Sequence, residues 1–332
     1  MISVAVAVVV GAFAVGGSPA ETRRATTEFE GWFLSAVDGG LKIPDPVERA
    51  SRSFRYVFVG GFRNERMPGY FAQNIAELRE HGINRGQIHV INPNSDRSSI
   101  ENAAAIRSGF LEVAAKGPER LVVIAHSRGA CDALAFALAN AGFVRDRVEA
   151  LFLIQGPFGG TGVAEYVVGR GTAMDRRMPW QHRLLGHVVA RLARFAARRT
   201  GLDAMEGMTR SASRQFWERT LAEYADAVAG VGPKTFYVRS QTNPSRLRFV
   251  RRAIAWYLAT YYHGPSDGMV AVADQMLPAL GTVIATLEAG HTDLTHHFPA
   301  TRAHRKVRRA LIRSILMTVG RPKADSATVS AR

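Results

Sequence analysis

Cysteine and acidic residues are both scarce in this chain. A single cysteine, Cys131, stands among 332 residues, so a disulfide bond within the chain is excluded. The 28 Asp and Glu residues are outnumbered by 43 Lys and Arg residues, which gives a formal net charge of +15. A positive surface attracts anionic partners. No nucleic-acid-binding motif is present, so we expect no nucleic-acid partner. We expect either an anionic membrane surface as partner or a solvated basic surface without one.

Lys and Arg are absent from the first 22 residues. Residues 2–15 are almost wholly apolar, and the small residues Ser18 and Ala20 fit the cleavage rule of a secretory signal. We therefore expect residues 1–20 to be a signal peptide, and the protein to be exported (periplasmic or secreted) or membrane-associated. The start lacks the usual positive charge, and the stretch is short for a membrane span. An uncleaved anchor and a misassigned start codon are the alternatives.

Residues 121–130 read Leu-Val-Val-Ile-Ala-His-Ser-Arg-Gly-Ala. They predict a buried strand, a sharp turn at Ser127 and a helix that begins at once. Ala125 and Gly129 flank the serine two residues away on each side, and small residues allow the strand and the helix to approach closely. This pattern indicates a nucleophile elbow, which exposes the serine hydroxyl above a sheet. The alternative is an ordinary tight turn with a serine that caps the helix.

A serine hydroxyl is a weak nucleophile that needs a base, and the base needs an acid to orient it. In this architecture both follow the serine, in the order Ser, Asp or Glu, His. We assign Asp267, in the polar loop 263–270, as the acid. We assign His291, which follows the apolar run 282–287 and a short turn, as the general base. Asp267 precedes a glycine, which is also typical of an ordinary turn carboxylate.

Other side chains compete for these roles. His263, His296 and His297 are alternative bases. His126 adjoins the serine but points away from it across the turn, so we interpret it as a packing residue. Cys131, one helical turn beyond the serine, is predicted to be a small buried residue and not a second nucleophile.

The oxyanion of a tetrahedral intermediate needs two preorganised donors. One expected donor is the backbone N–H of Arg128, the residue after the serine. The second should come from the loop after an earlier strand. Residues 55–59 predict that strand, and Gly60 and Gly61 follow it, which makes the Phe62 N–H the expected second donor. A glycine pair after a strand is also typical of tight turns.

Together these residues resemble the α/β-hydrolase superfamily, and within it the bacterial lipases and esterases, over residues 55–316. Ala-His-Ser-Arg-Gly at 125–129 is similar to the elbow of several lipases, with alanine where the commoner form has glycine. Residues 266–270 match the acid loop and 290–294 the histidine loop. Val-Gly-Gly-Phe at 59–62 is similar to the lipase Val-His-Gly segment, with glycine in place of histidine. The elbow and the two later loops are specific as a set.

Many lipases of this branch bind calcium, and the resemblance places one ligand at Asp293, two residues after His291. A hard cation needs several oxygen ligands. Residues 241–247, where the second carboxylate would lie, contain no Asp or Glu. We therefore expect no metal site, and the expected chemistry needs no cofactor.

The remaining strand and helix signals alternate, which predicts a doubly wound, mostly parallel α/β sheet with an inserted helical cap or lid. The expected organisation is a signal peptide (1–20), an N-terminal linker (21–50), the first part of an α/β-hydrolase core (51–163), a helical cap or lid (164–232), the second part of the core (233–320) and a disordered tail (321–332).

The expected insertion contains two apolar helical faces, in residues 180–195 and 216–228. It is interpreted either as a lid that opens at a lipid surface or as a fixed cap that packs on the core.

The chain is thus expected to be a serine carboxylic-ester hydrolase that cleaves a lipid-like acyl ester through an acyl-enzyme. Ser127 would attack the carbonyl, His291 would transfer the proton and Asp267 would hold the imidazole. Two alternatives are a thioesterase or amidase with the same triad, and a non-catalytic hydrolase-fold protein that binds a lipid or a partner.

Overall fold

The computed structural model describes residues 19–62, 64, 67, 69–94, 97, 99–168, 205–246, 264–278, 280–296 and 302–321. Several expectations lie wholly or almost wholly outside these residues. They are the signal peptide, the first helix of the insertion, the alternative bases His263 and His297, and the C-terminal tail. Within the described ranges, no helix is long and apolar enough to cross a membrane.

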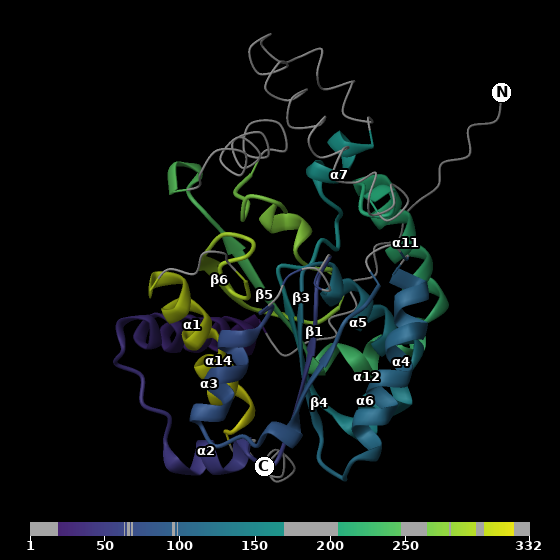
Figure 1. Ribbon diagram of the computed structural model, residues 1–332. Coiled ribbons are helices and arrows are strands. Elements are labelled where there is room, and N and C mark those ends of the chain that lie inside the picture. The colour runs from purple at the N-terminus through teal and green to yellow at the C-terminus, as the bar shows by residue number, and fades with distance from the viewer. Residues whose placement is uncertain are drawn as a thin grey trace, which may run out of the picture.

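A six-stranded parallel sheet forms the centre of the molecule (Figure 1). Its strands are β1 (Arg55–Val59), β2 (Ile88–Ile91), β3 (Leu121–His126), β4 (Val148–Ile154), β5 (Thr235–Gln241) and β6 (Thr282–Glu288). Their order across the sheet is β2-β1-β3-β4-β5-β6, and every pairing is parallel. The predicted parallel α/β sheet is therefore confirmed.

The strand order reverses between β1 and β3. The chain leaves β1 toward β2 at one edge, and it leaves β3 toward β4, β5 and β6 at the other. Loops that follow the two strands at such a reversal diverge above the sheet, and α/β proteins bind ligands in the crevice between them. Ser127 directly follows β3, so the fold places it at this point.

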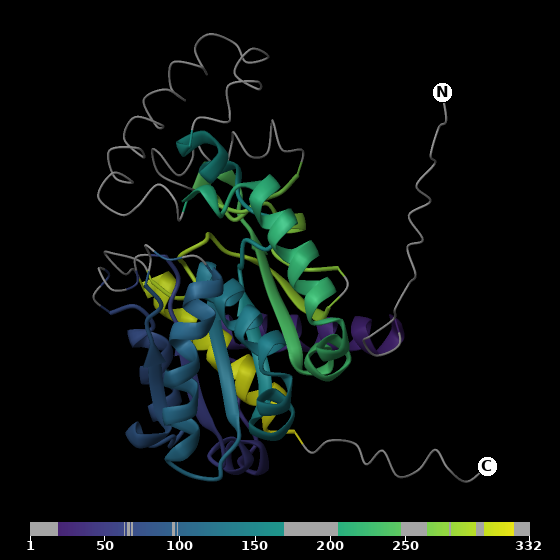
Figure 2. The ribbon, with the colours of Figure 1, turned by 90° about the vertical axis from the view of Figure 1, so that its right-hand side faces the viewer.

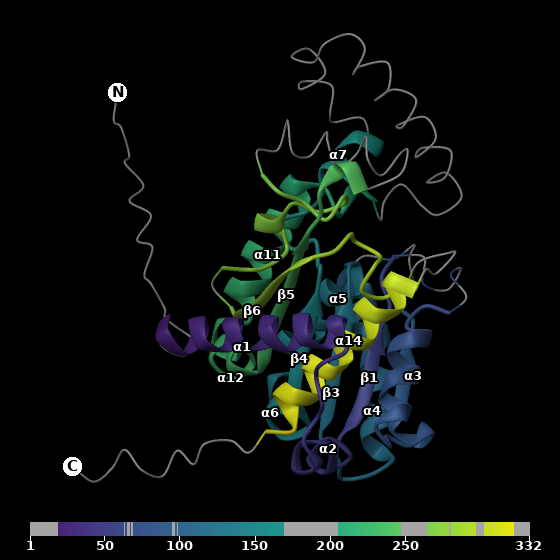
Figure 3. The ribbon, with the colours of Figure 1, turned by 90° about the vertical axis from the view of Figure 1, so that its left-hand side faces the viewer.

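Helices cover both faces of the sheet (Figures 2 and 3). One face carries α1 (Pro19–Asp38), α2 (Asp45–Ser51), α3 (Ala72–Glu80) and α14 (Arg302–Val319), and the other carries α4 (Ser99–Ala115), α5 (Arg128–Ala139), α6 (Ala141–Arg147), α11 (Arg210–Glu223) and α12 (Ala225–Val231). Shorter elements are α7 (Gly162–Val167) and the 3₁₀ turns Arg85–Gln87, Gly232–Lys234, Pro244–Arg246 and Val272–Asp274.

A hydrophobic core lies on each face of the sheet, and successive residues of one strand belong alternately to the two cores. In β1, Val57 and Val59 pack toward α4 and α5, whereas Tyr56 and Phe58 pack toward α3 and α14. Because both faces of the sheet are buried, the central strands read as continuous apolar runs.

The expectation that residues 21–50 form a linker is wrong, because helices α1 and α2 occupy most of this range. Phe29 of α1 is 1% exposed and lies in the core. Polar side chains of α1 also satisfy the free edge of β6: the Thr286 N–H donates to Glu30 (2.7 Å), and the Thr26 hydroxyl donates to the Val283 oxygen (2.8 Å). Covering an edge strand in this way prevents it from pairing with another chain.

The expectation of a cap over residues 164–232 is wrong for the second half of that range. Helices α11 and α12 lie beside the sheet, and Trp217 and Val231, 3% and 0% exposed, are buried in the same core as Leu151 of β4. These apolar residues cover β4 and β5. The lid and fixed-cap interpretations now concern residues 169–204, which lie outside the described residues.

A buried carboxylate joins α3 to α14. Glu77 accepts a hydrogen bond from Nε of Arg313 (2.6 Å) and forms an ion pair with Arg309. His81 bridges Glu77 (3.2 Å) to Glu48 of α2 (2.8 Å). Burial by itself would raise the pKa of Glu77, but its hydrogen bonds with His81 and Arg313 and the nearby positive charges lower it. Two of the positive charges of the chain, on Arg309 and Arg313, therefore pair with a buried carboxylate.

The burial of α1 can be tested with two residues of the same helix. We expect Phe29→Ala to lower the free energy of unfolding by about 3–5 kcal/mol, because the ring leaves a cavity in the core. Leu34, 62% exposed, is the matched control, and Leu34→Ala should change stability by no more than about 0.5 kcal/mol. Urea denaturation measures both. A Phe29→Ala protein as stable as the wild type would restore the linker interpretation.

The bridge made by His81 should depend on pH. Burial by itself would lower the pKa of His81, but hydrogen bonds to Glu77 and Glu48 and the charge of Glu77 raise it. The raised pKa means that the protonated ring stabilises the fold fully below the unfolded value of about 6.5, and that this stabilisation is lost as pH rises through the folded value. We expect His81→Gln to cost more unfolding free energy near pH 6 than near pH 9. An equal loss of unfolding free energy at the two pH values would show that protonated His81 does not stabilise the fold by bridging Glu77 and Glu48.

Candidate active site

Ser127 lies at a strained turn between β3 and α5, with φ 55° and ψ −133°. A residue other than glycine in such a conformation costs about 1–3 kcal/mol, which the surrounding structure must supply. A Cβ on Gly129 would lie 2.3 Å from the main-chain oxygen of Gly60, so only glycine allows the start of α5 to approach the end of β1. The structure thus has the strand, sharp turn and helix that the sequence predicts.

The loop after β1 packs directly against Ser127. A Cβ on Gly61 would lie 2.8 Å from the Ser127 Cβ and 2.8 Å from the Tyr70 hydroxyl. The Gly61 N–H donates to that hydroxyl at 3.3 Å. Phe62 follows Gly61 in this loop, and Arg128 is the first residue of α5. Both residues expected to provide oxyanion donors therefore belong to the segments that meet at Ser127.

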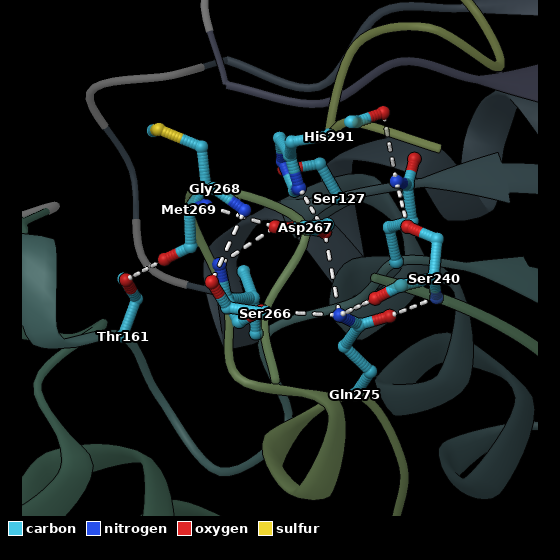
Figure 4. A network of polar contacts seen from close by, with 12 residues as sticks. Ser127, Thr161, Ser240, Ser266, Asp267, Gly268, Met269, Gln275 and His291 are labelled. Atoms are coloured by element: carbon cyan, nitrogen blue, oxygen red, sulfur yellow. Dashed lines mark hydrogen bonds and ion pairs between the residues drawn. The ribbon is translucent and has the colours of Figure 1, made fainter. Parts of the chain in front are cut away.

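Ser127, His291 and Asp267 form one hydrogen-bonded chain (Figure 4). Nε2 of His291 lies 2.9 Å from Oγ of Ser127, and Nδ1 lies 2.7 Å from Oδ2 of Asp267. A carboxylate accepts hydrogen bonds, so Nδ1 carries the proton and the lone pair of Nε2 faces the serine hydroxyl. Parallel strands bring their carboxyl ends to one edge of the sheet, which is how residues 164 positions apart in the chain meet here.

Asp267 is held by the backbone of its own loop. Its Oδ1 accepts the N–H groups of Met269 (2.9 Å) and Val270 (2.8 Å). Asp267 is 1% exposed, so these bonds replace water for the buried carboxylate. Its main-chain oxygen accepts the N–H of His291 (2.8 Å), which joins the acid loop and the histidine loop by backbone as well as by side chain.

Gln275 is a site residue that the sequence did not reveal. Its amide nitrogen donates to the main-chain oxygens of Ser240 (2.9 Å) and Val270 (3.1 Å), and it lies 3.4 Å from Oδ2 of Asp267. Its Oε1 accepts the N–H of Ser240 (2.7 Å). Gln275 thus fixes the acid loop to the end of β5 (Figure 4). No local pattern marks it, because its partners come from other segments of the chain.

His126 is buried as expected of a packing residue, and its ring also makes hydrogen bonds that the sequence did not predict. Both ring nitrogens are hydrogen-bonded, one of them to Gln155. His126 is the last residue of β3, and Gln155 is the first residue after β4. A buried imidazole or amide requires hydrogen-bonding partners. A polar residue at the end of an apolar strand was therefore the sequence signal that could have identified both.

The other residues considered as a base, a second nucleophile or a metal ligand have different contacts in the structure. His296 stacks on the ring of Tyr70, with 5.9 Å between ring centroids and 5° between planes. Cys131 is buried, and burial raises the pKa of its thiol well above the ordinary value, in keeping with an inert side chain. The carboxylate of Asp293 accepts the N–H of Gly290 (2.9 Å) and so shapes the histidine loop. In the part of the chain that the structure describes, no three His, Cys, Asp or Glu residues form a group that could hold a metal ion.

No protein-family model matches the sequence, and no match was found among curated proteins. The structure is similar to solved structures. A carboxyl esterase from a metagenome has a TM-score of 0.59 and 21% identity, over 85% of this chain and 79% of its own. A lipase of Bacillus licheniformis in its mature form has a TM-score of 0.56 and 15% identity, over 84% of this chain and 95% of its own. These similarities confirm the fold expected from the sequence motifs.

The close approach of Gly61 to Ser127 and Tyr70 predicts that a side chain at position 61 will destabilise the fold. We expect Gly61→Ala to lower the free energy of unfolding by about 1–3 kcal/mol, because the methyl group would overlap Ser127 and Tyr70. Gly31 in α1 is the matched control, since a Cβ there meets nothing within 4 Å. Gly31→Ala should stabilise the protein by up to about 1 kcal/mol through helix propensity. Thermal and urea denaturation compare the two, and a neutral Gly61→Ala would show that the loop does not pack as described.

Proposed function

We propose that this chain, which has the α/β-hydrolase fold, is a serine hydrolase that cleaves carboxylic esters with a lipid-like acyl group. One observation carries the proposal: His291 is hydrogen-bonded to Ser127 Oγ through one ring nitrogen and to Asp267 through the other. That arrangement turns a weak nucleophile into a reactive one.

In the proposed reaction, Ser127 Oγ attacks the ester carbonyl while Nε2 of His291 takes the hydroxyl proton. Asp267 holds the imidazole in the tautomer that leaves Nε2 free to accept, and it stabilises the imidazolium that forms. His291 then gives the proton to the leaving alcohol. The products of this half-reaction are the alcohol and an ester between the acyl group and Ser127.

Water completes the cycle. His291 removes a proton from the water molecule, the resulting hydroxide attacks the acyl-enzyme, and the proton returns to Ser127 Oγ as the acid leaves. No cofactor takes part in this scheme. The backbone N–H groups of Phe62 and Arg128 are the proposed donors to the oxyanion in both halves. The contact of Gly61 with Ser127, and the place of Arg128 at the positive end of the α5 dipole, support this assignment.

The same triad would also serve a thioesterase or an amidase. We favour a carboxylic ester because two proteins of similar fold are a carboxyl esterase and a lipase. Nitrophenyl esters of increasing acyl length, compared with matched thioesters and anilides, test the choice. Turnover highest for a thioester or an anilide would move the assignment to the alternative.

The nucleophile is tested by a fluorophosphonate probe, which labels an activated serine. We expect labelling at Ser127, and Ser127→Ala should abolish both labelling and ester cleavage. Asp267→Asn should lower kcat by about 10⁴-fold, because the amide favours the wrong imidazole tautomer. Asp146→Asn, an exposed aspartate in α6, is the matched control and should keep wild-type kcat. A wild-type protein that is folded, unlabelled and inactive would support the non-catalytic alternative.

A further inference from the structure

His126, the residue before the proposed nucleophile, has a hydrogen-bond partner at each ring nitrogen. Its side chain is buried, and Nε2 lies 3.0 Å from Oε1 of Gln155 and 2.8 Å from the main-chain oxygen of His291. Nδ1 lies 2.5 Å from the Tyr70 hydroxyl, with the Thr295 hydroxyl farther away at 3.5 Å. The ring thus contacts segments that are far apart in the chain.

The contacts of Gln155 decide which nitrogen of His126 carries the proton. The amide nitrogen of Gln155 donates to the main-chain oxygen of Gly290 (3.1 Å) and to the hydroxyl of Ser240. Its oxygen therefore faces His126 as an acceptor, and the main-chain oxygen of His291 is also only an acceptor. The proton consequently lies on Nε2, and Nδ1 has a lone pair that accepts.

Tyr70 completes the connection to the loop after β1. Because Nδ1 of His126 accepts, the Tyr70 hydroxyl donates to it, and the hydroxyl oxygen accepts the N–H of Gly61 (3.3 Å). Burial of His126, and after it the proximity of His291, lower the pKa of His126 to about 3. The ring is therefore neutral near neutral pH and can donate at one nitrogen while it accepts at the other.

We propose that Tyr70 and His126 are positioning residues that hold the loop of Gly61 and the main chain of His291 in register around Ser127. The inference rests on the proposed function, in which the first segment carries an oxyanion donor and the second the general base. A misplacement of about 1 Å in such a site can cost about 100-fold in rate. An apolar pair would fill the same space but would fix neither segment.

Tyr70→Phe tests the inference, because it removes the hydroxyl and keeps the ring. Tyr56→Phe is the matched control: Tyr56 is fully buried and Tyr70 is partly buried, and the Tyr56 hydroxyl donates to the main-chain oxygen of Ser51 (2.9 Å) near the start of β1. Both variants should lower Tm to a similar extent. Only Tyr70→Phe should lower kcat for a nitrophenyl ester, by about 10–100-fold, with KM within about twofold of the wild type. A kcat equal to that of Tyr56→Phe would overturn the inference.

A double mutant tests whether Tyr70 acts through His126. If it does, adding Tyr70→Phe to His126→Phe should change kcat by less than about threefold, because the connection is already broken. Full additivity of the two losses would show that the residues act separately, and would overturn the connection. Tyr70→Phe alone keeps the test valid if His126→Phe does not fold.

Nuclear magnetic resonance of ¹⁵N-labelled histidine separates this inference from the proposed function. The wild type and Tyr56→Phe should show His126 as a neutral ring with its proton on Nε2. Tyr70→Phe should keep that proton on Nε2 but show a changed Nδ1 shift, because Nδ1 loses the hydroxyl that donates to it. This readout needs no turnover. If the wild type cleaves no ester, the proposed function fails, and the spectrum still tests the hydrogen bond from Tyr70 to His126 on which the inference depends. An unchanged His126 spectrum in Tyr70→Phe would overturn it.

Discussion

The backbone of Ser127 adopts a strained conformation with a positive φ where β3 ends and α5 begins. A residue with a side chain holds this conformation only when its surroundings impose it. Here they are mostly backbone: the Ser127 N–H donates to the Ile154 oxygen (2.9 Å), and Gly129 fits against Gly60. The hydroxyl is thereby presented above the carboxyl edge of the sheet. The loops that follow β1, β5 and β6 are then built around that point.

Polar side chains around the site form a continuous network, which passes through the main chain of Ser240 between Gln275 and Gln155. It runs from Asp267 through Gln275, Ser240 and Gln155 to His126. Burying polar groups is unfavourable unless each finds a partner, so an apolar core of the same shape would serve stability at least as well. The network instead fixes the orientation of the side chains that belong to it. Each hydrogen bond restricts the rotation of an imidazole, an amide or a carboxylate that an apolar contact would leave undefined.

The sheet and the elbow were predictable because their signals are local. Apolar runs bounded by turns identify buried strands, and small residues around Ser127 identify the close approach of a helix. Helix α1 was missed although Phe29 and Phe33 recur at helical spacing, because polar residues dominate the segment around them. For α11 the sequence revealed the apolar face, but it did not reveal that this face packs against the sheet. Periodicity shows that a face will be buried, and only packing shows against what.

The sequence by itself determined the sharp turn at Ser127, the two later loops that carry an aspartate and a histidine, and the apolar runs of a parallel sheet. The tertiary structure decided that His291, and not His296, faces the serine, and that His126, Gln155 and Gln275 are hydrogen-bonding residues of the site. The physical reason is one of length scale. A strand or a turn is set by neighbours within a few positions, whereas a hydrogen bond requires two atoms within about 3 Å. Where those atoms come from distant positions in the chain, the packing of whole helices and strands sets their distance.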